Sequence, residues 1–96
     1  MKILFFGDSI TDMGRNRDEN ADEIYTYGSG YPMLVASALY RKNPLQYQVI
    51  NRGIGGDRVA DLTARIRYDV WIQNPDVLTI LVGINNVWDE LNYNDA

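Results

Sequence analysis

"ILFFGDSITDMG", residues 3–14, joins a short apolar run to a turn of glycine, aspartate and serine. A continuous apolar run that ends in a turn is typical of a strand buried on both faces of a parallel sheet. Ser9 in this turn has two explanations. Turns and helix caps favour small polar residues, whereas acyl transfer needs a hydroxyl nucleophile. The rest of the sequence shows which of the two explanations of Ser9 fits better.

A long polar segment and then an amphipathic helix follow this first run. Residues 12–30 are polar, charged and glycine-bearing, and they predict a long surface loop. Pro32 suits the first turn of a helix with one apolar face, which Pro44 ends. We interpret the charged residues of the loop as solvated, with substrate contact as the alternative: Arg15, Arg17, Asp18 and Glu19.

The second half of the chain repeats the order of strand and helix. Residues 47–50 predict a strand, and Asp57 is a plausible N-cap for a helix whose apolar residues lie at helical spacing over 59–70. Residues 77–83 are apolar and β-branched and predict a third strand. The last stretch, 84–96, is turn-like and then weakly amphipathic. Strands that alternate with helices predict an α/β fold with a parallel sheet and right-handed crossovers.

Three turns rich in glycine, serine and asparagine follow the three predicted strands, at residues 7–10, 51–57 and 83–86. Ligands bind at the carboxyl edge of a parallel sheet, where these turns meet. Each turn alone is explained by local geometry. Together they place the hydroxyl of Ser9 near two hydrogen-bond donors that suit an oxyanion. These donors are the backbone N–H of Gly56 and the side-chain amide of Asn85.

These turns resemble the sequence blocks of the SGNH, or GDSL-type, hydrolase family of esterases and lipases. "FFGDSIT" matches the first block, "NRGIGGD" the second and "LVGINN" the third, in order along the chain. The resemblance implies a flavodoxin-like three-layer α/β sandwich and metal-free hydrolysis of carboxylic esters, with no cofactor. It implies Ser9 as nucleophile and an oxyanion hole formed by the N–H groups of Ser9 and Gly56 and the side chain of Asn85. Short-chain or acetyl esters are the expected substrates.

Two departures from the family pattern matter. Asn86 stands where the third block usually has aspartate, which suggests a local change in hydrogen bonding. The fourth block, an Asp-x-x-His, is missing, and the chain contains no histidine at all. We therefore expect residues 1–96 to be the N-terminal half of a single SGNH-hydrolase-like domain with five strands. By itself this piece is predicted to be inactive, because a serine hydroxyl needs a base.

Composition limits the other functions. Nine Lys and Arg against thirteen Asp and Glu give a net charge of −4 and a pI near 4.5, which argues against nucleic acid as the main partner. The absence of cysteine excludes disulfides and thiolate metal sites. No stretch is apolar enough to span a membrane, and the default expectation is a cytoplasmic protein. An unpaired sheet edge at the third strand, near Leu78, Ile80 and Val82, predicts self-association.

Other functions fit the residues less well. A phospho-acceptor receiver domain built around Asp8 would need a lysine after a later strand, and lysine occurs only at positions 2 and 42. We interpret Asp8 instead as a brace for the turn. Dinucleotide binding through "GIGGDR" would need glycine where Arg58 stands. A non-catalytic flavodoxin-like binding module stays open, because such a protein would also lack the base.

Overall fold

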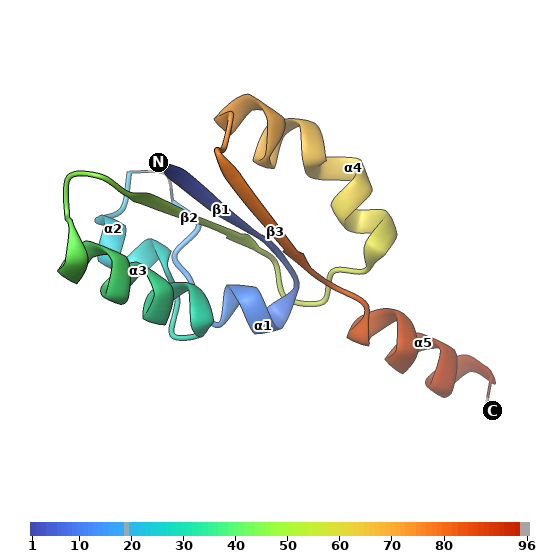
Figure 1. Cartoon of the computed structure of the whole chain (residues 1–96). Helices are drawn as coiled ribbons and strands as arrows, with labels where there is room; N and C mark the ends of the chain where they lie inside the picture. The colour runs from blue at the N-terminus through green and yellow to red at the C-terminus, as the bar shows by residue number, and fades with distance from the viewer. Residues whose placement is uncertain (19, 95–96) are drawn as a thin grey trace.

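The computed structural model describes residues 1–18 and 20–94, and its centre is a parallel sheet of three strands in the order β2-β1-β3 (Figure 1). This is the strand order expected for the first part of a flavodoxin-like sheet. All three strands are parallel, so their carboxyl ends lie at one edge. Their bounds are β1 Lys2–Gly7, β2 Gln48–Gly53 and β3 Val77–Leu81.

Helices cover both faces of the sheet. In Figure 1, α3 lies with α1 and α2 on one side, α4 lies on the other, and α5 extends away from the body of the molecule. The arrangement has the three layers of an α/β sandwich. The helices are α1 Ser9–Asp12, α2 Glu23–Thr26, α3 Tyr31–Lys42, α4 Val59–Asp69, the 3₁₀ turn η1 Trp71–Gln73, and α5 Ile84–Asn94.

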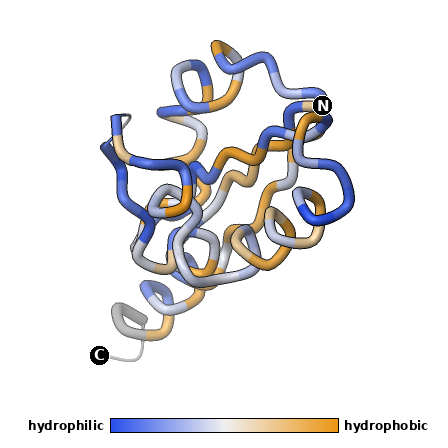
Figure 2. Tube along the Cα trace, turned by 90° about the vertical axis from the view of Figure 1, so that its left-hand side faces the viewer, coloured by the Kyte–Doolittle hydropathy of each residue, from blue (hydrophilic) through white to orange (hydrophobic). Residues whose placement is uncertain are grey.

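The central strand is buried on both faces, as its apolar run predicts. Leu4 and Phe6 belong to the core beneath α4, together with Leu62. Phe5, between them in sequence, points to the opposite face and packs with Ala36 of α3. Successive side chains of a strand alternate between faces, so one short run supplies both cores. Figure 2 shows hydrophobic colour along the strands and hydrophilic colour in the outer loops.

The structure corrects the prediction of one continuous loop over residues 12–30. Asp12 is the last residue of α1, and α2 forms within the segment. Tyr27 is buried in the core beneath α3, and its hydroxyl donates a hydrogen bond to that of Tyr40 at 3.0 Å. Tyr27 is thus one residue that holds this polar segment against the core, and composition does not reveal it. The stretch after residue 83, predicted as turn-like and then weakly amphipathic, is the helix α5.

The structure also corrects the N-cap of α4. The cap position is held by Arg58, whose backbone N–H donates a hydrogen bond to the Asp61 carboxylate at 2.9 Å. Asp57 turns toward Arg65 of the same helix, and the two side chains form an ion pair of 2.7 Å. The carboxylate of Asp57 could either cap the helix or pair with Arg65. Because Arg65 lies within reach, the carboxylate forms the ion pair and does not cap the helix.

The outer edge of β3 is left without a neighbouring strand in the described residues 1–18 and 20–94. Ile80 and Leu81 of this strand are 56% and 45% exposed, although both are large and apolar.

Within the described residues 1–18 and 20–94, none of the helices combines the length and the apolar character that crossing a membrane requires.

Candidate active site

The first turn, residues 7–10, leads from β1 into α1. Asp8 caps this helix, because its buried carboxylate accepts a hydrogen bond from the N–H of Ile10 at 3.1 Å. The interpretation of Asp8 as a brace for the turn is confirmed. Ser9 is the first residue of α1 and is exposed. Its hydroxyl group is therefore accessible to a ligand that approaches from solvent.

The helix α1 lies close to the ends of the strands because Gly7 has no side chain. A Cβ at this position would collide with the Oγ1 atom of Thr11 and the carbonyl oxygen of Leu81. Thr11 is itself fully buried, and its Oγ1 lies 2.6 Å from the hydroxyl of Tyr31 on α3. These contacts fix α1, and Ser9 with it, against the sheet.

The second turn, residues 54–57, follows β2 and passes beside Ser9. A Cβ built on Gly55 would lie 3.7 Å from the Cβ of Ser9, so the two turns are in van der Waals range. Gly56 has a φ of 87°, in the left-handed region that favours glycine. No acceptor in residues 1–18 or 20–94 meets its N–H. This N–H is therefore available to a ligand near Ser9.

Asp12 at the end of α1 holds the second turn in place. Its Oδ2 accepts hydrogen bonds from the N–H of Gly55 at 2.9 Å and from the Arg17 guanidinium at 2.6 Å. Burial acts to raise the pKa of this carboxyl, but the bonds from Arg17 and Gly55 outweigh it and hold the pKa below its usual range. Asp12 is thus a carboxylate that anchors the turn, a role that sequence reasoning missed.

Residues 83–86, predicted as a third turn, are Gly83 and the first residues of α5, and they bring Asn85 to the second turn. Its Nδ2 donates a hydrogen bond to the carbonyl oxygen of Asp57 at 2.9 Å. An amide nitrogen carries two N–H groups, so the second one is left to meet a ligand. Asp57 directly follows Gly56 in the chain. The carboxamide of Asn85 is consequently fixed one residue away from the free N–H of Gly56.

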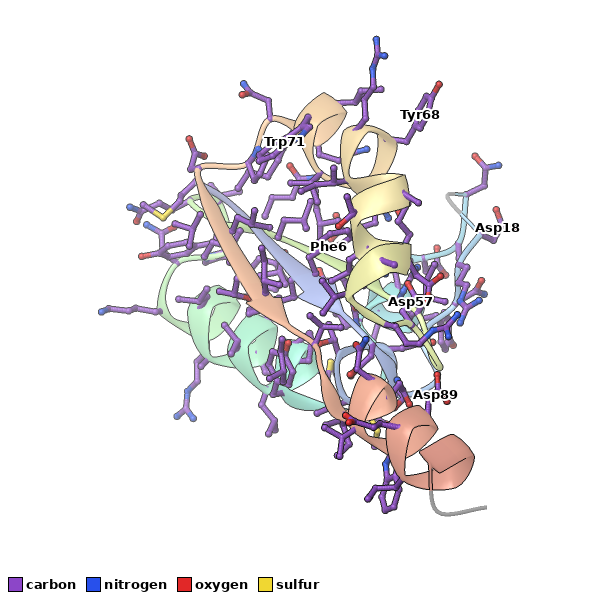
Figure 3. All side chains as sticks on the ribbon, turned by 90° about the vertical axis from the view of Figure 1, so that its right-hand side faces the viewer. Phe6, Asp18, Asp57, Tyr68, Trp71 and Asp89 are labelled. Atoms are coloured by element: carbon purple, nitrogen blue, oxygen red, sulfur yellow. The ribbon has the colours of Figure 1, made fainter. Side chains whose placement is uncertain are left out.

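Two further contacts hold α5 to the start of α4. Asn86 Oδ1 accepts a hydrogen bond from the N–H of Val59 at 3.1 Å, and the carboxylate of Asp89 pairs with Arg58 at 3.1 Å. Figure 3 shows Asp89 on α5 below Asp57. The replacement of the usual aspartate by Asn86 keeps an acceptor for this helix N–H, so the local contact survives without the charge.

The structure therefore brings the three residues expected to act together, Ser9, Gly56 and Asn85, to the carboxyl edge of the sheet. Ser9 adjoins the second turn through Gly55, and Asn85 is bonded to it through Asp57. No acceptor within the described part of the chain meets the N–H of Ser9. A hydroxyl group and three N–H donors thus converge on one rim. Their catalytic roles stay predictions at this point.

Asn51 is a second positioning residue that sequence reasoning missed. Its amide nitrogen donates to the carbonyl oxygens of Thr11 at 2.7 Å and Tyr27 at 2.8 Å, and its Oδ1 accepts from the N–H of Gly53 at 2.9 Å. The side chain is buried, with 2% of its surface exposed. Asn51 falls in the turn predicted after the second strand, whereas β2 extends to Gly53 and includes it. These bonds hold Thr11 of α1 and Tyr27, which follows α2, against β2. Because Ser9 belongs to the same short helix as Thr11, they also help to fix the position of Ser9 relative to the sheet.

Of the charged residues after α1, Arg15 is less solvated than predicted, whereas Arg17 and Asp18 are exposed. Arg15 donates from Nε to the carbonyl oxygen of Gly53 at 2.7 Å, and burial lowers the pKa of its guanidinium to about 10. Arg17 pairs with Asp12. Asp18 is exposed, as expected for a solvated residue, whereas Glu19 lies outside the described residues.

A polar cavity of about 270 Å³ lies along β2, on the side of the segment that contains Arg15. Its lining includes Arg15 and Arg52 and extends to Gln48 at the start of β2. Ser9, Gly56 and Asn85 do not line it, so this cavity is separate from the candidate nucleophile. In residues 1–18 and 20–94 no group of three or more Asp, Glu, His or Cys is placed to hold a metal ion.

Comparison with known proteins points to one family. The GDSL-like Lipase/Acylhydrolase family matches residues 5–95 of this chain. A curated relative, an acetylxylan esterase from Geobacillus stearothermophilus, is 47% identical over 88 residues. The match covers 91% of this chain and 40% of the relative. The chain thus spans about two fifths of the length of that esterase.

Solved structures give the same result. The crystal structure of that Geobacillus acetylxylan esterase superposes with a TM-score of 0.87 and 44% identity, over 97% of this chain and 43% of the other. An alpha/beta hydrolase enzyme from the metagenome of Lake Arreo, Spain, superposes with a TM-score of 0.87 and 35% identity, over 97% and 44%. Two structures of the Geobacillus esterase are described as catalytic mutants, one with a serine and one with a histidine replaced by alanine.

Proposed function

This chain belongs to the GDSL-like lipase/acylhydrolase family, and we propose that it supplies the nucleophile and the oxyanion-binding groups of a serine ester hydrolase. One observation carries the proposal. The exposed hydroxyl of Ser9 lies beside a turn whose Gly56 N–H is free within the described residues and to which the Asn85 amide is bonded. Ser9 and Gly56 are both exposed, so a ligand at this edge of the sheet can reach the hydroxyl and the free N–H, as an oxyanion site requires.

The proposed reaction starts with attack of the Ser9 oxygen on the carbonyl carbon of an ester. A base takes the hydroxyl proton, and the carbonyl oxygen becomes an oxyanion that accepts hydrogen bonds from Ser9, Gly56 and Asn85. Collapse of this intermediate breaks the bond to the alcohol, which leaves with the proton. Water then attacks the acyl-serine in the same way and releases the carboxylic acid. The base is a histidine that these 96 residues do not contain.

We propose short acyl groups, acetyl above all, on carbohydrate hydroxyls as the substrate class. The 47% identity to an acetylxylan esterase supports it. A lipase acting on long acyl chains would need an apolar channel beside Ser9.

Labelling with a fluorophosphonate tests the proposal, because covalent attachment requires an activated serine hydroxyl. The protein to use is a chimera in which this chain is continued by the part of the Geobacillus acetylxylan esterase that it does not match. We expect labelling at Ser9, none in the Ser9→Ala chimera, and none in the 96-residue chain alone. A folded chimera that resists the reagent would favour the binding module over the hydrolase.

We further propose that the isolated chain self-associates through β3. Its outer edge has unpaired backbone groups, and the exposed apolar side chains Ile80, Leu81 and Trp88 lie on β3 and α5. In sedimentation experiments the mean mass should rise with concentration. Ile80→Lys should abolish the rise, whereas Leu34→Lys, on the exposed side of α3, should not. A mass that stays monomeric at all concentrations would contradict this proposal.

A further inference from the structure

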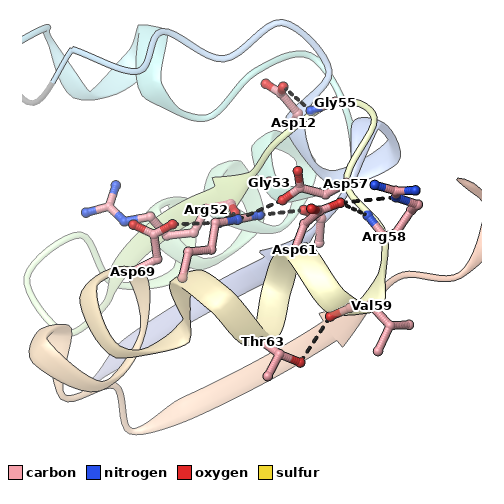
Figure 4. A network of polar contacts seen from close by, with 12 residues as sticks. Asp12, Arg52, Gly53, Gly55, Asp57, Arg58, Val59, Asp61, Thr63 and Asp69 are labelled. Atoms are coloured by element: carbon pink, nitrogen blue, oxygen red, sulfur yellow. Dashed lines mark hydrogen bonds and ion pairs between the residues drawn. The ribbon is translucent and has the colours of Figure 1, made fainter.

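Arg65 of α4 makes an unusual number of contacts beneath the three turns. Its Nε pairs with Asp57 at 2.7 Å, and its Nη1 pairs with Asp69 at 2.7 Å. Nη1 also donates to the carbonyl oxygen of Arg52 at 2.8 Å, and Nη2 donates to that of Gly7 at 3.0 Å. Figure 4 shows the polar network that includes Arg52, Asp57 and Asp69. The guanidinium group thus bonds two carboxylates and two strand ends.

Three of these partners lie at the ends of β1 and β2 or at the end of the second turn: Gly7, Arg52 and Asp57. Gly7 is the residue before Asp8 and Ser9, and its carbonyl oxygen also accepts the N–H of Ile54 at the start of the second turn. Arg52 lies in the last part of β2. Asp57 follows Gly56, and its own carbonyl oxygen holds the Asn85 amide at 2.9 Å. Every proposed functional group is therefore one or two residues, or one hydrogen bond, away from an Arg65 contact.

The geometry requires a guanidinium group and not just a positive charge. Arginine has five N–H donors in a rigid plane, and the four contacts use both ends of that plane. The carbon of the guanidinium lies 4.5 Å from the centre of the Phe6 ring, so the plane is also supported from the core. The Arg65 side chain is 16% exposed. A lysine could pair with the carboxylates but could not reach both carbonyl oxygens in fixed directions.

We propose that Arg65 is a positioning residue, which sets the second turn at the right distance from Ser9 and thereby aligns the Gly56 N–H and the Asn85 amide on one oxyanion. The proposal rests on the proposed hydrolase function for its catalytic consequence. Its structural part is independent of it: loss of the guanidinium should release the second turn from the end of β1 while the sheet stays intact.

The test compares Arg65→Lys and Arg65→Gln with Arg67→Gln, an exposed arginine of the same helix. In amide NMR spectra of the 96-residue chain, we expect Arg65→Lys to shift or broaden the signals of Gly56, Ser9 and the Asn85 side chain. Signals from α3 should stay in place. In the chimera, kcat for p-nitrophenyl acetate should fall about 10- to 100-fold, the cost of displacing a reacting group by about 1 Å. KM should stay within about threefold, because ground-state binding is unaffected.

The other possible outcomes also test whether Arg65 positions the second turn. Arg65→Lys with unchanged spectra and unchanged kcat would overturn the proposal, and so would an Arg65→Lys chain that loses its fold altogether while Arg67→Gln keeps it. Should Arg65→Gln alone unfold, Arg65→Lys carries the test, since it keeps the charge toward Asp57 and Asp69. If the unmutated chimera has no esterase activity, the hydrolase function fails, and the NMR comparison still decides the role of Arg65.

Discussion

The 96-residue chain alone should hydrolyse p-nitrophenyl acetate about 10⁶-fold more slowly than the chimera that contains a histidine base. A serine hydroxyl is a weak nucleophile until a base removes its proton as it attacks. Among the described residues 1–18 and 20–94, the carboxylates beside Ser9 already have other partners. Asp8 accepts the N–H of Ile10, and Asp12 is occupied by Gly55 and Arg17. Initial rates measured in the same buffer give the ratio directly.

Two controls make this ratio interpretable. The Ser9→Ala chimera should fall to the level of the chain alone, because nucleophile and base act as a unit and losing either costs about as much as losing both. Circular dichroism of the chain must show folded α/β structure, so that inactivity is not caused by unfolding. Comparable turnover by the folded chain and the chimera would mean that another group activates Ser9, and the proposed mechanism would then be wrong.

The fold could be predicted because each strand has a local signal. The run before Gly7 has no polar residue, and Phe5 and Phe6 pack on opposite faces of the sheet. A strand with two buried faces needs helices on both sides, and the sequence supplies two amphipathic segments between the strands. The strand order β2-β1-β3 then follows from right-handed crossovers.

What failed were the places where a distant partner decides the local structure. Asp57 has the composition of an N-cap, but an ion pair of 2.7 Å with Arg65 draws its carboxylate away. Arg15 belongs to a charged stretch, yet it reaches back to the carbonyl oxygen of Gly53. Arg65 lies eight residues after Asp57, and Gly53 lies 38 residues after Arg15, so both partners are outside the few residues that define a cap or a turn. Local propensity holds only where tertiary contacts do not compete with it.

The candidate site divides in the same way. Ser9, Gly56 and Asn85 each lie within four residues of the carboxyl end of a strand, so topology alone predicts that they come to the same edge of the sheet. The residues that hold them there were not foreseen. Asp12, Asn51 and Arg65 act by hydrogen bonds between segments more than 30 residues apart, such as Asn51 to Thr11 and Gly55 to Asp12. Sequence analysis finds the groups that would react, whereas the structure is needed to find those that align them.

Asn85→Ala in the chimera should lower kcat about 10²- to 10³-fold with little change in KM, the effect of removing one oxyanion donor. One N–H of the carboxamide is used by the Asp57 carbonyl, and the other is the proposed donor to the oxyanion. The substrate carbonyl has little negative charge before attack. The lost hydrogen bond therefore belongs mainly to the transition state, and kcat is the quantity that falls.

Asn86→Ala is the matched control, because it removes the neighbouring amide. Asn86 bonds the N–H of Val59 and not the second turn, so this variant loses a contact of α5 with α4 but keeps the proposed donor. We expect its kcat to fall less than about tenfold, since a hydrogen bond in an exposed place contributes only about 1 kcal/mol to structure. Equal losses in the two variants would show that α5 acts as a whole, by holding the second turn in place. Asn85 would then be an anchor for Asp57 and not a donor to the oxyanion, and the hole would consist of the backbone N–H groups of Ser9 and Gly56 alone.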